Sequence, residues 1–208
     1  MQYVVYPPRP EGKVQPSQLA RLEKEKKYVV QRKFNGDRCV IHIENRKVHL
    51  FSRYGKSFDR YKTPAFLERE VLALNLLDQE YWLDGELLHN KAAETGVKNT
   101  LVLYDVLQAG NYLYGVKQMD RLELLKKIAR NPTKLAEPAV ALRVSDHIWM
   151  AQTWDVGFEE HFKDFFTEPL IEGLVLRLKE SFLDNFGASE YLVKWVIRCR
   201  KTGATYHF

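Results

Sequence analysis

The chain has 208 residues, of which 45% are hydrophobic and 12% aromatic, and its 32 Lys and Arg residues exceed its 27 Asp and Glu residues by a net charge of +5. These proportions are typical of a globular rather than a disordered chain, and the length accommodates one sizeable core, so we predict a single domain over residues 1–208. No apolar run approaches the roughly 20 residues that cross a bilayer, and the polar N-terminus does not resemble a signal peptide, so no membrane association is expected. The mild positive excess permits nucleic-acid binding without requiring it.

The two cysteines, Cys39 and Cys199, have no metal-ligand spacing, and the six histidines form no metal cluster. Cys39 lies inside a predicted strand and is interpreted as a small buried hydrophobic residue. This cysteine usage fits a reducing compartment. We therefore expect a cytoplasmic protein, and we expect it to be monomeric.

Residues 6–12 are rich in proline, which excludes a helix, and we expect this extended segment to wrap the surface of the domain. Apolar residues at helical spacing, with proline near several of the ends, predict helices over residues 17–26, from 64 to about 74, 119–130 and 158–167. Alternating or continuous apolar runs predict strands over residues 28–30, 38–44, 47–53, 81–89, 100–107, 140–150, 173–178 and 191–198. Strands outnumber the helices that could cross between them, so an α+β fold with mainly antiparallel sheets flanked by helices is predicted.

The chemistry that the sequence suggests is centred on a turn between two of these strands. In this segment, called the lysine turn (Lys33 to Arg38), Lys33 and Asn35 precede Gly36, and Arg38 follows it. A glycine at such a turn lets the backbone approach a ligand closely, and the amine, the amide and the guanidinium would converge there. A lysine becomes a useful nucleophile when burial or neighbouring cations lower its pKa. By itself, however, this composition is equally typical of a solvated hairpin.

Five further stretches carry polar side chains where predicted strands end. In several of them a glycine, which weakens a strand, lies beside an acid or a lysine. These stretches are residues 51–56, 82–87, 101–106, 171–177 and 191–195.

In this order the motifs resemble those of the covalent nucleotidyltransferases, the group that contains ATP-dependent DNA ligases, RNA ligases and messenger-RNA capping enzymes. The resemblance covers roughly residues 28–198, and it implies an ATP-grasp-like adenylation domain. The motifs that carry it are Lys33 to Arg38, Ser52 to Lys56, Asp84-Gly85-Glu86, Tyr104-Asp105, Glu172-Gly173 and Lys194.

The resemblance also implies roles for individual residues. Lys33 would attack the α-phosphate of ATP and form a lysyl-AMP intermediate, with Lys194 as the second catalytic cation. AMP would then pass to a 5′-phosphate end, which a 3′-hydroxyl would join. The implied nucleotide-binding residues are Gln31, Lys33, Arg38, Glu86, Tyr104, Glu172 and Lys194. Asn35, Glu86 and Glu172 would hold Mg²⁺, the carboxylates through water, because magnesium keeps several waters and takes few carboxylates.

The expected nucleic-acid contacts come from the basic side chains at the end of the first hairpin, which is predicted over residues 38–53, and at the end of the chain. The resemblance implies that Arg53 contacts the phosphates of the nucleic acid, and the other residues of the set are predicted from their positive charge. The set is Arg53, Lys56, Arg198, Arg200 and Lys201. The alternative for these residues is a solvated basic surface.

Two departures from the family pattern affect the prediction. The last motif usually carries two lysines one residue apart, whereas Lys194 is followed by Trp195 and Val196. Arg198 or Lys201 could replace the second lysine, but the sequence alone does not decide between them. Only fourteen residues follow Lys194, too few for an oligonucleotide-binding barrel, so a stand-alone catalytic domain without that barrel is expected.

We therefore predict an ATP-dependent polynucleotide ligase, and we favour RNA-containing ends because some RNA ligases lack the barrel. A DNA ligase that seals nicked duplex is the alternative, since Arg38 matches the DNA-ligase form of the lysine turn. A second alternative is an inactive ligase-like module that only binds nucleic acid. Lys33, Glu86 and Glu172 speak against it, because binding alone would not need them.

Overall fold

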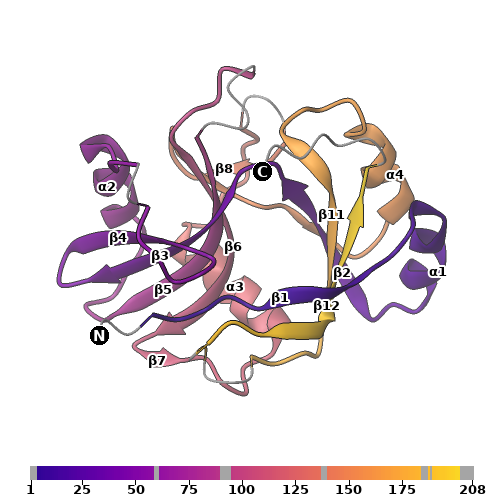
Figure 1. The fold of residues 1–208 in the computed structure, drawn as a ribbon, viewed down its shortest axis with the longest axis horizontal. Coiled ribbons are helices and arrows are strands. Elements are labelled where there is room, and N and C mark those ends of the chain that lie inside the picture. The colour runs from indigo at the N-terminus through magenta and orange to yellow at the C-terminus, as the bar shows by residue number, and fades with distance from the viewer. Residues whose placement is uncertain are drawn as a thin grey trace.

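The computed structural model describes residues 4–58, 61–89, 95–136, 140–183, 187 and 189–201. Two sheets stand side by side, one around β3 to β6 and the other around β2, β11 and β12 (Figure 1). Most strand pairs in both sheets are antiparallel, and helices flank the sheets, so the predicted α+β class is confirmed. The described residues contain no closed barrel.

The first sheet has the strand order β1-β12-β11-β2-β10. Only β1 and β12 run parallel. Its strands are β1 (Arg9–Lys13), β12 (Leu192–Arg200), β11 (Ile171–Leu178), β2 (Tyr28–Phe34) and β10 (Thr153–Trp154). The short helices α1 (Leu19–Lys24) and α4 (Phe158–Asp164) pack on this sheet through a core that includes Leu19, Val30 and Phe158.

The second sheet has the order β4-β3-β5-β6-β9-β8, with β7 paired to β6. Its strands are β4 (Lys47–Ser52), β3 (Asp37–Glu44), β5 (Tyr81–Leu88), β6 (Thr100–Ala109), β7 (Asn111–Tyr112), β8 (Leu142–Arg143) and β9 (Ile148–Met150). Helices α2 (Ala65–Leu72) and α3 (Gln118–Ile128) pack against it, and α3 contacts β6. A 3₁₀ turn (Pro16–Gln18) precedes α1.

Several elements follow directly from local sequence. Asn45 and Arg46 both adopt positive φ, 49° and 57°, as a two-residue turn requires, and they place Glu44 opposite Lys47. Pro64 forms the N-cap of α2, as its fixed φ favours. No helix among the described residues is long and apolar enough to cross a membrane.

Three predicted elements differ from the structure. The hairpin that was the alternative for the lysine turn is not formed, because β2 belongs to one sheet and β3 to the other. The extended N-terminal segment contributes β1, whose backbone pairs with β12. Residues 140–150 form two short strands, β8 and β9, rather than one. The first difference is the important one for function, because Asn35 and Gly36 connect the two sheets.

Candidate nucleotide-binding site

A cavity of about 740 Å³ is formed by residues of both sheets, and the lysine turn forms part of its wall. Its acidic residues are Asp37, Glu86 and Glu172. Cationic side chains outnumber them, which favours a polyanionic ligand. The cationic residues that line the cavity are Arg9, Arg32, Lys33, Arg38, Arg53, Arg177, Arg198 and Arg200.

Lys33 contacts a carboxylate on the neighbouring strand. β2 and β11 pair antiparallel with Lys33 opposite Gly173, and the Lys33 Nζ donates to Glu172 Oε1. Both side chains are mostly buried, 19% and 12% exposed. Arg200 Nε lies 3.5 Å from the other oxygen of Glu172, so two cations share this carboxylate.

Gly173 allows this arrangement because β12 passes very close to it. Its φ is +150°, and a Cβ at this position would lie only 2.0 Å from the carbonyl oxygen of Cys199. A side chain here would push β12 away from β11. The glycine beside Glu172 therefore brings Arg200 next to the Lys33 pair.

Glu86 lies on β5, and its carboxylate faces the same cavity. It accepts hydrogen bonds from the Gly36 N–H (3.2 Å) and the Tyr104 hydroxyl (3.4 Å). Burial raises the pKa of Glu86 to about 7, and the charge of Glu172 adds to this effect, while Lys33 and Arg38 oppose it.

Arg38 forms a bidentate ion pair with Asp84, in which Nε donates to Oδ1 and Nη2 donates to Oδ2. Burial alone would lower the pKa of Arg38, but the Asp84 carboxylate outweighs it, so the pKa lies above the ordinary value. The same pair limits how far burial raises the pKa of Asp84, which is completely buried. Arg38 is thus a fixed cation whose guanidinium also lies 5.5 Å from the ring centroid of Tyr104.

The predicted nucleotide-binding residues are therefore brought together, with one exception. Gln31, Lys33, Arg38, Glu86, Tyr104 and Glu172 all line the cavity. Lys194 is exposed and is absent from the lining.

The position of Lys194 outside the cavity lining coincides with an irregularity in β12. Pro10 of β1 pairs with Val193 and Gly12 pairs with Ile197, so β12 carries extra residues between these two points. The pairing of β12 with β11 extends only as far as Val196. The residues of β12 that line the cavity are Val196, Arg198 and Arg200.

Arg198 and Arg200, two cations separated by one residue, both line the cavity. Arg198 and Arg200 were predicted to contact nucleic acid, and the last motif was predicted at Lys194. The signal that could have found them is the Arg198-Cys199-Arg200 spacing itself.

Of the predicted nucleic-acid set, Arg53, Arg198 and Arg200 line the cavity, whereas Lys56 and Lys201 are not among the lining residues. Arg53 lines the cavity and donates to the Tyr54 hydroxyl, whereas Lys56 is exposed and outside the cavity lining. Lys201 Nζ donates to the Glu168 carbonyl (2.9 Å), and burial lowers the pKa of Lys201.

Several residues at the cavity were not predicted, and Tyr54 and Arg9 are two of them. Tyr54 is 46% exposed, and the guanidinium of Arg9 lies 5.7 Å from the centroid of its ring. Arg9 belongs to β1, in the segment predicted to wrap the surface, and no local pattern marks it as a site residue.

Asn35, Glu86 and Glu172, the predicted magnesium residues, all lie on the cavity wall. No group of three or more His, Cys, Asp or Glu residues in the described part of the chain could hold a metal. The two glutamates repel one another enough to contribute to the raised pKa of Glu86. A divalent cation held mainly through water would relieve that repulsion, so these residues fit magnesium.

Comparison with known proteins gives a family match and many structural matches. Residues 13–98 match the family described as the ATP dependent DNA ligase domain. No curated protein sequence matches the chain.

Among solved structures, mycobacterial DNA ligase D, determined with ATP, matches with a TM-score of 0.65 at 16% identity, covering 94% of this chain and 60% of that one. The ATP-dependent DNA ligase of bacteriophage T7, also with ATP, gives 0.54 at 14% identity, covering 91% of this chain and 67% of that one. An RNA ligase of Naegleria gruberi with AMP and Mn gives a TM-score of 0.50 at 12% identity, covering 96% of this chain and 59% of that one.

This chain therefore spans about 60% of the length of the mycobacterial enzyme. Both DNA and RNA ligases share its fold. Residues 13–98 therefore match the ATP dependent DNA ligase domain family, and nearly the whole chain has the fold of a ligase catalytic domain.

Proposed function

We propose that this chain is the nucleotidyl-transfer domain of an ATP-dependent polynucleotide ligase and that Lys33 is its nucleophile. The observation that carries the proposal is the position of Lys33. Its ammonium faces a cavity lined by seven guanidinium groups, an environment suited to a triphosphate.

In the first step, Nζ of Lys33 attacks the α-phosphorus of ATP. An Nζ–P bond forms, the bond from that phosphorus to the bridging oxygen breaks, and pyrophosphate leaves. A lysine paired with a carboxylate is a cation and cannot attack, so the contact between Lys33 and Glu172 must first separate and Lys33 must lose a proton to water. Arg200 is well placed for this change, because it lies 3.5 Å from Glu172 and can keep that carboxylate paired.

The fixed cations have distinct tasks in this proposal. Arg38 is held by Asp84 and cannot swing away, so it would stabilise charge on the phosphates without reorganisation. Arg198 and Arg200 would meet the phosphates from the opposite sheet. Glu86 and Glu172, with Asn35, would hold magnesium, which neutralises charge on the phosphates when it is bound.

In the remaining steps AMP would pass from Lys33 to a 5′-phosphate end, and a 3′-hydroxyl would displace it to seal the strand. Arg53 and Tyr54 border the cavity and are the proposed contacts to that strand. RNA-containing ends remain the first candidate substrate. Nicked duplex DNA is the second, and the match of residues 13–98 to a DNA ligase domain favours it.

The test has two stages. Protein incubated with ATP and magnesium should gain one AMP by intact-mass measurement, and pyrophosphate should remove it. The adenylylated protein should then seal at least one of three labelled substrates on a gel: nicked RNA–DNA hybrid, single-stranded RNA or nicked DNA. Absence of the AMP adduct would refute the proposed function, and an adduct without sealing would restrict it to nucleotidyl transfer.

A further inference from the structure

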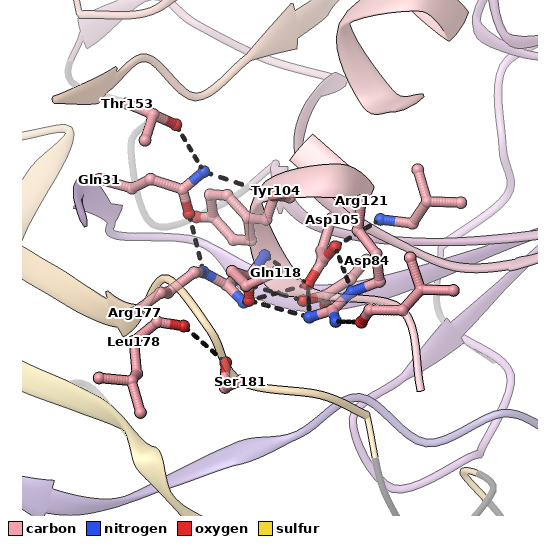
Figure 2. A network of polar contacts seen from close by, with 12 residues as sticks. Gln31, Asp84, Tyr104, Asp105, Gln118, Arg121, Thr153, Arg177, Leu178 and Ser181 are labelled. Carbon is pink, nitrogen blue, oxygen red and sulfur yellow. Dashed lines mark hydrogen bonds and ion pairs between the residues drawn. The ribbon is translucent and has the colours of Figure 1, made fainter. Parts of the chain in front are cut away.

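The two sheets are joined at one place by a buried charge network. Arg177 lies on β11 of the first sheet, and its Nη1 donates to Oδ2 of Asp105 on β6 of the second at 3.3 Å. Arg121 of α3 holds the same carboxylate with two hydrogen bonds of 3.1 and 3.0 Å. Figure 2 shows Arg177, Asp105 and Arg121 directed toward one another. Their side chains are at most 3% exposed, so neither guanidinium can rotate without leaving a buried charge unpaired.

A second contact between the sheets is exposed to solvent. The turn that follows β4 presents Arg53 and Tyr54, and the guanidinium of Arg9, on β1 of the first sheet, lies 5.7 Å from the ring centroid of Tyr54. Tyr54 is 46% exposed. A Cβ on Gly55 would lie only 2.6 Å from the hydroxyl of Tyr6, so the N-terminal segment packs closely on this turn. Because the side chains here are solvated, their order depends on the few contacts that they make with one another.

Arg9 is anchored through both its backbone and its side chain. Its backbone N–H donates to the carbonyl of Tyr191 (3.1 Å), and its Nη1 forms an ion pair with Glu190. Both partners belong to the segment that leads into β12, so the guanidinium is held relative to the first sheet. The two side chains are 33% and 37% exposed, and an ion pair with that exposure contributes little to the stability of the fold. Its effect is to direct Arg9 toward Tyr54.

Tyr54 in turn restrains Arg53. Nη2 of Arg53 donates to the Tyr54 hydroxyl, and the Arg53 guanidinium lies 4.6 Å from the centroid of the same ring. An exposed arginine without such contacts loses rotamer freedom when it binds a phosphate, and this loss weakens binding. Contacts that order the side chain beforehand remove part of that cost.

We propose that Arg9 is a positioning residue, held by Glu190, that orders Tyr54 and through it Arg53 for contact with a nucleic-acid strand. The inference rests on the proposed function in that Arg53 contacts the strand. It adds that the N-terminal strand β1 supports this contact and that a carboxylate, Glu190, favours the binding of a polyanion. The alternative is that Arg9 itself binds a phosphate, in which case Glu190 competes with the strand.

The decisive variant is Glu190→Ala, because the two roles of Arg9 predict opposite results. If Arg9 binds phosphate directly, removal of the carboxylate frees a cation and strengthens binding. If Arg9 acts by positioning, binding should weaken about two- to fivefold, the size expected for an exposed ion pair and a cation–π contact. Fluorescence anisotropy on a nicked DNA duplex, without ATP and at about 150 mM salt to screen distant charges, measures the Kd. Unchanged or tighter binding would overturn the inference.

A double-mutant cycle tests whether Arg9 acts through Arg53. Arg9→Ala should weaken binding about two- to fivefold in the wild-type background and hardly at all in Arg53→Ala, because residues that act through one another are not additive. Lys13→Ala is the matched control. It also removes one positive charge from β1, but Lys13 is exposed and outside the cavity lining, so its small effect should be the same in both backgrounds. The same factor for Arg9→Ala in both backgrounds would overturn the inference.

Tyr54→Phe tests the link between the two arginines. Phenylalanine keeps the ring beside Arg9 but has no hydroxyl to accept from Arg53, so binding should weaken by a similar factor. Unchanged binding in Tyr54→Phe, or a wild-type chain that does not bind the duplex, would overturn the inference. These measurements need neither ATP nor Lys33. Failure of the AMP adduct would therefore refute the proposed function and leave the binding cycle as an independent result.

Discussion

Lys33 and Glu172 lie on neighbouring antiparallel strands, and the ammonium of one contacts the carboxylate of the other at the wall of the cavity. The ion pair lies where a nucleotide phosphate would have to approach Lys33. It therefore describes a resting state in which the lysine is oriented but protonated. In the proposed reaction Glu172 both holds the nucleophile in place and must release it.

Lys33→Ala should abolish the AMP adduct, because no other lysine lines the cavity in the described part of the chain. The cost in stability should be modest, about 1 kcal/mol, since Glu172 retains Arg200 at 3.5 Å. Intact-mass measurement after incubation with ATP and magnesium checks the adduct, and urea unfolding checks the fold. Lys56→Ala is the matched control and should be labelled like the wild type. Label on Lys33→Ala would assign the nucleophile elsewhere.

Arg200→Ala and Lys194→Ala should separate the two possible positions of the last basic motif. Arg200 lines the cavity and approaches Glu172, so its loss should slow adenylylation at least about tenfold. Lys194 is exposed outside the cavity lining, so its loss should change the rate less than about twofold. Single-turnover labelling with radioactive ATP measures both rates. The reverse order would place the motif at Lys194 after all.

Glu86 should make the stability of the protein depend on pH. Burial raises its folded-state pKa to about 7, well above the ordinary value of 4.5, so the folded state binds this proton more tightly than the unfolded chain. The resulting stabilisation is complete below pH 4.5 and is lost as the pH rises to about 7.

Glu86→Gln, which cannot ionise, should therefore gain stability relative to the wild type between pH 5 and pH 8. The expected gain is on the order of 3 kcal/mol at most. Urea unfolding of both proteins at the two pH values measures the difference. A difference that is the same at pH 5 and pH 8 would show that Glu86 does not titrate in this range.

Gly173→Ala should disrupt the site through the backbone. The new Cβ would lie 2.0 Å from the carbonyl of Cys199, so β12 must move and the unfolding free energy should fall by more than about 2 kcal/mol. Gly115→Ala is the matched control, because Gly115 also has a positive φ, +74°, but no atom within 4 Å of the added Cβ. It should cost about 1 kcal/mol. Similar losses in the two variants would mean that the close approach of β12 is not required.

Arg53 and Lys56 should contribute to strand binding but not to adenylylation. Each phosphate contact adds about −0.9 to the log–log salt slope on duplex DNA, so Arg53→Ala with Lys56→Ala should flatten the slope by about 2. Fluorescence anisotropy on a nicked duplex at several salt concentrations measures the slope. The AMP adduct of the double variant should form at the wild-type rate. An unchanged salt slope would mean that Arg53 and Lys56 do not contact the strand.

The sequence determined the local elements of this protein and the residue types of its site. The Asn45-Arg46 turn, Pro64 before α2 and the alternating runs of β3 and β4 are specified by residues close together in the chain, because turn and strand preferences act over a few positions. The lysine turn, the two glutamates beside glycines and Arg38 were likewise evident from the residues that surround them.

Tertiary structure decided which of these groups meet. Whether Arg200 or Lys194 reaches the cavity depends on the irregular pairing of β12 with β1, and residues 183 to 185 positions apart set that register. Arg177 was indistinguishable from a surface arginine until Asp84, Asp105 and Gln31 surrounded it. The physical reason is that burial, charge pairing and close backbone approach arise between strands distant in sequence, so no local pattern encodes them.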